Sequence, residues 1–89
     1  MIIGLDYDGT YTRDPELWDQ FIEMFQAKGH TIIIATMRHE GESIDHIFKD
    51  KCEIVYTRRL AKKVFLDNKN IKPDIWVDDN PMWIYTDAT

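Results

Sequence analysis

Short apolar runs alternate along this chain with longer segments in which apolar residues recur every three or four positions. The apolar runs are each short enough to be buried strands, and they cover residues 2–5, 31–35, 53–56 and 75–77. The periodic segments have the spacing of helices with one buried face, and they cover residues 14–28, 42–49 and 60–68. Strands that alternate with helices form a parallel sheet joined by right-handed crossovers. The pattern therefore predicts an α/β fold with a small parallel sheet and helices on its faces.

Residue types at the segment ends support this assignment. Asp14 suits an N-cap, Pro15 suits a first helical position, and Gly29 suits the end of the first helix. The expected inward-facing residues of the three helices are Leu17, Trp18, Phe21, Ile22 and Phe25, then Ile44, Ile47 and Phe48, then Leu60, Ala61, Val64 and Phe65. The tail, residues 82–89, shows no comparable pattern. We expect it either to cover an edge of the sheet or to fray.

Length and composition limit the number of domains. A chain of 89 residues accommodates a single domain, residues 1–89, and 44% hydrophobic residues are enough for a compact core. No internal repeat, low-complexity stretch or interdomain linker interrupts the pattern. We therefore expect one small domain with a modest stability margin.

Charge and cysteine content exclude several classes of function. The net charge is -5 and there is no basic run, so binding to duplex nucleic acid is not expected. Cys52 is the only cysteine, which excludes an internal disulfide and favours a reducing compartment. No apolar stretch approaches the ~20 residues of a membrane span, and the N-terminus lacks the pattern of a signal peptide. We therefore expect a cytoplasmic protein without membrane contact.

Polar and charged residues follow every predicted strand. In open parallel sheets, ligands bind beyond the carboxyl ends of the strands, where these residues would meet. They are Asp6-Tyr7-Asp8-Gly9-Thr10, Thr36-Met37-Arg38, Thr57-Arg58-Arg59 and Asp78-Asp79, with Lys62 and Lys63 on the preceding helix. Four converging carboxylates would repel one another unless some were protonated or a cation lay among them, and hard oxygen ligands without His or Cys favour magnesium. A lysine and an arginine beside them would complete a pocket for a phosphate dianion.

This ordered set resembles the four motifs of the haloacid dehalogenase superfamily. Asp6-Tyr7-Asp8-Gly9-Thr10 resembles the first motif, DxDGT, and Thr36 resembles the second. Lys62 resembles the lysine of the third motif, and Asp78-Asp79 resembles the acidic fourth motif. The motifs appear in the family's order and span nearly the whole chain. The resemblance implies a three-layer, Rossmann-like fold with four main strands in the order 3-2-1-4.

The resemblance also implies a role for each matching residue. Asp6 would be the nucleophile that is transiently phosphorylated, and Asp8 would be the general acid and base. Thr36 and Lys62 would complete the catalytic set, and the phosphate-binding residues would be Gly9, Thr10, Arg38 and Lys63. The magnesium ligands would be Asp6, Asp8, Asp78 and Asp79, with Asp8 contributing its backbone carbonyl. Lys63 could take the place of Lys62, and Asp78 and Asp79 could exchange roles.

One feature departs from many members of the family. Only residues 11–14 and 39–41 separate the first and second motifs from their helices, which leaves no room for an inserted cap domain. This resembles the capless branch, whose members often act on large substrates or obtain closure from a partner subunit. We expect a magnesium-dependent phosphomonoester hydrolase, with a nucleotide or another phosphorylated metabolite as the small substrate, or else a macromolecular one. A homo-oligomer could supply the closure. A phosphotransferase and a non-enzymatic phosphate-binding or oligomerising module are the alternatives.

Overall fold

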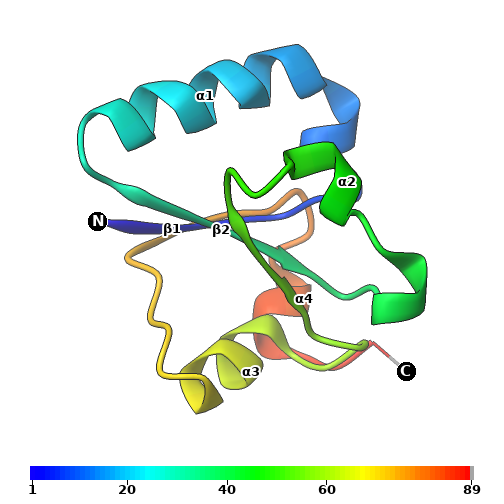
Figure 1. The fold of residues 1–89 in the computed structure, drawn as a ribbon. Helices are drawn as coiled ribbons and strands as arrows, with labels where there is room; N and C mark the ends of the chain where they lie inside the picture. The colour runs from blue at the N-terminus through cyan, green and yellow to red at the C-terminus, as the bar shows by residue number, and fades with distance from the viewer. Residues whose placement is uncertain (89) are drawn as a thin grey trace.

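The computed structural model describes residues 1–88 and contains a four-stranded, all-parallel sheet (Figure 1). The strands are β1 (Ile2–Leu5), β2 (Thr31–Thr36), β3 (Glu53–Tyr56) and β4 (Ile75–Val77). Their order across the sheet is β3-β2-β1-β4, so the first strand of the chain pairs with β2 on one side and β4 on the other. The predictions of a small α/β domain, a parallel sheet and the order 3-2-1-4 are confirmed.

Helices cover both faces of this sheet. The helices are α1 (Pro15–Ala27), α2 (Asp45–Phe48), α3 (Lys62–Asn68) and α4 (Met82–Tyr85), with short 3-10 turns at Tyr11–Arg13 and Glu40–Glu42. Figure 1 shows α1 and α2 on one side of the sheet and α3 and α4 on the other. The connections after β1 and β2, residues 6–14 and 37–44, carry only these turns and no inserted domain. In the part of the chain that the structure describes, no helix is both long and apolar enough to cross a membrane.

Alternation along β2 divides the core between the two faces. Successive side chains of a strand point to opposite faces. Ile32 and Ile34 therefore join the cluster under α1 and α2, which includes Ile22 and Phe48. Ile33 and Ala35 join the smaller cluster under α3, around the fully buried Leu66. The apolar run of β2 thus contributes side chains to the core on both faces of the sheet.

The first two helices largely match the sequence analysis. Asp14 caps α1, because its carboxylate accepts a hydrogen bond from the backbone N–H of Leu17 at 3.2 Å. Ile22 is buried and the three predicted aromatic residues of α1 are half-buried, but Leu17 is 52% exposed, so that assignment was wrong. Leu17 lies in the first turn of α1, beyond the edge of the core, so its side chain remains exposed to solvent. The second helix is shorter than predicted at both ends. Glu40–Glu42 form a separate 3-10 turn, so α2 begins only at Asp45, and the left-handed backbone of Lys49 and Asp50 ends it at Phe48.

The third helix differs from its prediction in both start and orientation. Residues 57–60 form a turn in which Arg58 and Arg59 have positive φ angles, so α3 begins only at Lys62. Lys62 and Leu66 are its buried residues, whereas Leu60 and Val64 are 47% and 58% exposed. The prediction was therefore wrong for Leu60 and Val64, but Ala61 is buried and Phe65 packs against the core as predicted. The tail resolves into α4, which packs against α3.

Candidate functional site

Three carboxylates meet where the neighbouring strands β1 and β4 end. Asp6 directly follows β1 and Asp78 follows β4, and these strands pair in register through Leu5 and Val77. The backbone N–H of Asp6 donates to the carbonyl of Val77 at 2.9 Å, which extends the pairing by one residue. One carboxylate oxygen from each of Asp6, Asp78 and Asp79 lies within 4.8 Å of the others. We call this group the acidic cluster.

A buried lysine joins two members of the acidic cluster. Lys62 is the first residue of α3 and its side chain is 3% exposed. Its Nζ lies 2.6 Å from Asp6 Oδ1 and 2.6 Å from Asp78 Oδ2. The neighbouring Lys63 points away, and its Nζ donates to Asp67 at 3.0 Å on the surface. Of the two lysines considered from the sequence, the structure therefore brings Lys62 to the cluster and leaves Lys63 outside it.

Gly9 and Thr10, in the turn after β1, lie against the acidic cluster. The hydroxyl of Thr10 lies 3.0 Å from Asp6 Oδ2 and 3.1 Å from Asp79 Oδ1, and it has one proton to donate to either. It also accepts the backbone N–H of Asp79 at 3.0 Å. Gly9 has a φ of +86°, and a Cβ there would lie 2.6 Å from Asp79 Oδ2. Only glycine allows both this turn and the close approach of Asp79.

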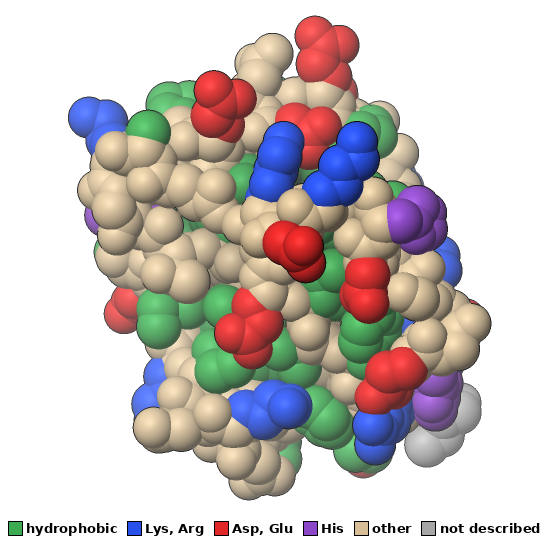
Figure 2. Space-filling view, in the orientation of Figure 1, with side chains coloured by type: hydrophobic (Ala, Val, Ile, Leu, Met, Phe, Trp, Pro, Cys, Tyr) green, Lys and Arg blue, Asp and Glu red, His purple; other side chains and the backbone are tan. Residues whose placement is uncertain are grey.

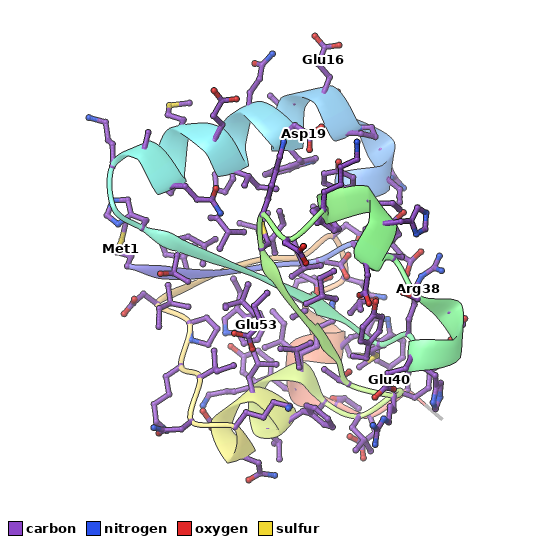
Figure 3. All side chains as sticks on the ribbon, in the orientation of Figure 1. Met1, Glu16, Asp19, Arg38, Glu40 and Glu53 are labelled. Carbon is purple, nitrogen blue, oxygen red and sulfur yellow. The ribbon has the colours of Figure 1, made fainter. Side chains whose placement is uncertain are left out.

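Asp8 and Arg38 form an ion pair beside the acidic cluster. Nε and Nη2 of Arg38 donate to the two carboxylate oxygens of Asp8, each at 2.8 Å. The guanidinium also lies over the ring of Tyr7, 5.3 Å from its centroid. Figure 3 shows Arg38 at the end of the sheet opposite Met1, where β2 ends. The carboxylate of Asp8 is therefore oriented by Arg38 and is not part of the three-carboxylate group.

Thr36 lies deeper than the other motif residues. It is the last residue of β2 and is 1% exposed. Its hydroxyl oxygen accepts the backbone N–H of Arg38 at 3.3 Å. Thr36 thus supports the turn that carries Arg38, and it does not line the pocket described next.

A pocket of about 280 Å³ opens over the acidic cluster. It is lined by Asp6, Asp8, Met37, Arg59, Lys62, Asp78, Asp79, Asn80, Trp83 and Ala88. Sequence reasoning placed Met37 and Arg59 among the residues that follow the strands, but it gave them no role in the site. Asn80, Trp83 and Ala88 were not among the predicted site residues, although Asn80 could have been found as the neighbour of Asp79. No sequence pattern marked Trp83 and Ala88 as pocket residues, because tertiary contacts of the tail bring them to the pocket.

Burial and hydrogen bonding shift the acidity of the cluster in opposite directions. Burial raises the pKa of Asp6 to about 7, although the nearby Lys62 ammonium acts to lower it. Burial also acts to raise the pKa of Asp79, but hydrogen bonds with Asp6 and Thr10 outweigh it, and the pKa is lowered. One buried ammonium thus faces three carboxylates. Full ionisation of the cluster would require a further cation.

The acidic cluster has the donor set of a site for a hard cation. Its three members offer oxygen ligands and include no histidine or cysteine. Both oxygens of Asp78 already accept hydrogen bonds, from Lys62 Nζ at 2.6 Å and from the backbone N–H of Asn80 at 3.0 Å. Asp79 is more exposed. The oxygens of Asp6 also have partners, Lys62 at Oδ1 and Thr10 at Oδ2. The residues present therefore fit a metal ion, and Asp79 is the most available of the three.

Comparisons with models of protein families, with curated proteins and with solved structures find no match for this chain. Its function must therefore be argued from the residues and their geometry. The surface adds one observation: Figure 2 shows acidic and basic side chains interspersed on the face in view, without a single large basic patch.

Proposed function

We propose that this chain is a magnesium-dependent phosphomonoester hydrolase of the haloacid dehalogenase type, with Asp6 as its nucleophile. The observation that carries the proposal is the buried Lys62 ammonium, bonded to both Asp6 and Asp78 at 2.6 Å beneath an open pocket. Burying ions rarely stabilises a fold more than apolar packing would, so such a cluster is weak evidence for a structural role. Groups with perturbed acidity in a pocket are instead typical of functional sites.

In the first step, a carboxylate oxygen of Asp6 attacks the phosphorus of a phosphate monoester. A bond forms between that oxygen and phosphorus while the bond from phosphorus to the ester oxygen breaks. Asp8 in its acid form, which requires one of its two hydrogen bonds to Arg38 to open, gives its proton to the departing oxygen, which leaves as an alcohol. Lys62, already in contact with Asp6, balances the negative charge of the phosphoryl group as it transfers.

In the second step, water attacks the phosphorus of the aspartyl-phosphate on Asp6. The carboxylate of Asp8 takes the proton from this water, and the bond from Asp6 to phosphorus breaks. Inorganic phosphate leaves, Asp6 returns to its carboxylate form and Asp8 is protonated again. Arg38 orients Asp8 beside the pocket through two hydrogen bonds of 2.8 Å, so this acid and base has a defined position before substrate binds.

Magnesium suits the oxygen donors of the acidic cluster. We propose Asp6 and Asp79 as its carboxylate ligands. The single hydroxyl proton of Thr10 can be donated to only one of these two residues at a time, whereas Asp78 holds Lys62 in position and also accepts the backbone N–H of Asn80. When bound, the ion would neutralise charge on the phosphoryl oxygens, as metal ions do in phosphoryl transfer.

The test is phosphate release from p-nitrophenyl phosphate with added magnesium. Asp6→Asn should lower turnover by about 10³-fold or more, since removal of a catalytic nucleophile typically has at least this effect. Asp67→Asn, which changes an exposed carboxylate paired with Lys63, should leave turnover unchanged. Undiminished turnover by the Asp6→Asn protein, with a native circular dichroism spectrum, would refute the mechanism. Transfer to added ethanol would reveal a phosphotransferase.

A further inference from the structure

Part of the pocket has no role in the chemistry proposed above. The apolar residues Met37 and Trp83 line the same pocket as Asp6 and Lys62, and Arg59 lines it as well. Trp83 comes from α4 and is half-buried. The pocket therefore combines a charged, phosphate-ready portion with an aromatic and apolar one.

The tail that carries Trp83 is fixed at both ends. Before α4, the carbonyl of Asn80 accepts the backbone N–H of Trp83 at 3.1 Å. After α4, Asp87 accepts the backbone N–H of Ala61 at 2.7 Å, and Ala88 donates to the carbonyl of Arg59 at 2.8 Å. Between them, Ile84 is 4% exposed and anchors α4. The indole of Trp83 thus belongs to a built wall of the pocket.

We propose that Trp83, together with Met37, binds a flat aromatic ring in the leaving group of the substrate. This inference rests on the proposed function and specifies its substrate class as an aromatic phosphate monoester. An indole presents a large planar surface on which aryl groups and nucleobases stack, and methionine sulfur makes favourable contacts with aromatic rings. A pocket of about 280 Å³ has room for a phosphoryl group and a single ring system.

Arg59 supports the same assignment. Its Nη1 donates to the carbonyl of Met37 at 2.6 Å, so the guanidinium is held against the residue that lines the apolar portion. A planar cation in this position can lie against the face of an aromatic ring. An aliphatic leaving group such as glycerol would use neither Trp83 nor this cation.

Binding of phosphonates to the wild-type protein tests the proposal without requiring turnover, because their carbon–phosphorus bond resists hydrolysis. Titration calorimetry with magnesium would compare benzylphosphonate with methylphosphonate. Trp83→Leu should raise the Kd of benzylphosphonate about tenfold, as loss of a stacking partner does, and leave that of methylphosphonate unchanged. Trp83→Phe should largely restore the aromatic preference. Tyr85→Leu, which changes an exposed aromatic residue on the same helix outside this pocket, should change neither Kd.

Equal weakening of both phosphonates in the Trp83→Leu protein, or no weakening of either, would overturn the proposal. If that variant does not fold by circular dichroism, Met37→Ala should produce the same selective loss, and an unselective effect would count against the subsite. Competition against benzylphosphonate then distinguishes two sources of the ring. Stronger displacement by adenosine 5′-monophosphate than by methylphosphonate indicates a nucleotide and stronger displacement by phenyl phosphate alone indicates an aryl phosphate, whereas displacement by neither better than by methylphosphonate overturns the proposal.

These outcomes separate this inference from the proposed function. Selective binding of benzylphosphonate by a protein that hydrolyses no phosphate ester would refute the hydrolase and retain the aromatic subsite. Turnover with equal kcat/KM for phenyl phosphate and glycerol 3-phosphate, unchanged in the Trp83→Leu protein, would retain the hydrolase and refute the subsite.

Discussion

Replacing Lys62 by methionine tests the electrostatic core of the site. Methionine has about the length of lysine without its charge, so the substitution removes the ammonium that contacts Asp6 and Asp78 while largely preserving the packing. We expect a large loss of stability in metal-free buffer at pH 8. The same change at Lys63 should have little effect, because Lys63 is half-exposed and pairs with Asp67 on the surface.

The magnitude follows from the distances. Carboxylate oxygens of Asp6 and Asp78 lie within 4.8 Å of each other. Two unit charges at that separation repel by about 3.5 kcal/mol at an effective dielectric constant of about 20. Removing one partner from a buried ion pair typically costs about 3–5 kcal/mol. For a chain of 89 residues, whose total stability is on the order of 4–13 kcal/mol, that loss would be severe.

Urea denaturation followed by circular dichroism provides the measurement. With a slope of about 1.3 kcal/mol per molar urea, Lys62→Met should lower the midpoint by about 3 M, and Lys63→Met by less than about 0.8 M. The deficit of Lys62→Met should shrink at pH 5, because protonation of the carboxylates removes their repulsion. Similar midpoints for the two variants would refute the buried ion cluster. An equal deficit at pH 5 and pH 8 would show that packing, rather than charge, explains the loss.

Three further predictions address the surroundings of the cluster. Because burial raises the pKa of Asp6 from 3.8 to about 7, the folded state retains a proton that the unfolded state has released between these values. The metal-free protein should therefore lose stability as the pH rises from about 4 to 7, by up to about 1.4 kcal/mol per pH unit in thermal unfolding. Gly9→Ala should lower the stability by about 1–2 kcal/mol and weaken magnesium binding in calorimetry, since its Cβ would lie 2.6 Å from a carboxylate oxygen of the cluster. Arg38→Lys should reduce kcat by about 10²-fold in phosphate-release assays, because a lysine cannot hold Asp8 through two parallel hydrogen bonds.

Matched variants make these predictions specific. Asp6→Asn should abolish the fall in stability between pH 4 and 7, and a persistent fall would assign it to another group. Gly29→Ala imposes the same φ of +86° with nothing within 4 Å of the new Cβ, so it should reduce stability without changing magnesium binding. Equal magnesium affinities in the two glycine variants would contradict the role of Gly9. Arg58→Lys changes an arginine paired with Glu40 and should leave kcat unchanged. An Arg38→Lys protein with full kcat would show that Asp8 needs no such partner.

The strands were predictable because their apolar runs are bounded by turn residues. Three of the four have the bounds expected from sequence, and β2 is longer by Thr36 alone. The burial of Lys62 at the start of α3 was not predictable, because periodicity assigns apolar residues to the core and treats a lysine as exposed. Lys62 is buried through its partners Asp6 and Asp78, which lie on other elements. Hydrophobic patterning contains no information about such distant partners.

The candidate site was likewise predictable from the sequence only in part. The convergence of Asp6, Asp78 and Asp79 follows from the rule that parallel strands end at one edge of the sheet, so sequence reasoning could locate it. Sequence reasoning could not show that Arg38 would bind the side chain of Asp8. The contribution of Trp83 depends on how the tail folds back onto the turn before α3. That contact depends on tertiary structure, and no periodic pattern in the sequence indicates it.

The strand order has a consequence for how the protein acquires its site. The first strand lies at the centre of the sheet, and its partner β4 follows about seventy residues later, with Ile3 opposite Ile75. A growing chain can pair β1 with β2 early, but one edge of β1 stays unpaired until the last quarter of the chain has been synthesised. The same late event brings Asp78 and Asp79 to Asp6, after a long loop has been closed. Formation of the acidic cluster would therefore report the pairing of β4 with β1, and intermediates that lack β4 would present an open strand edge and no assembled acidic cluster.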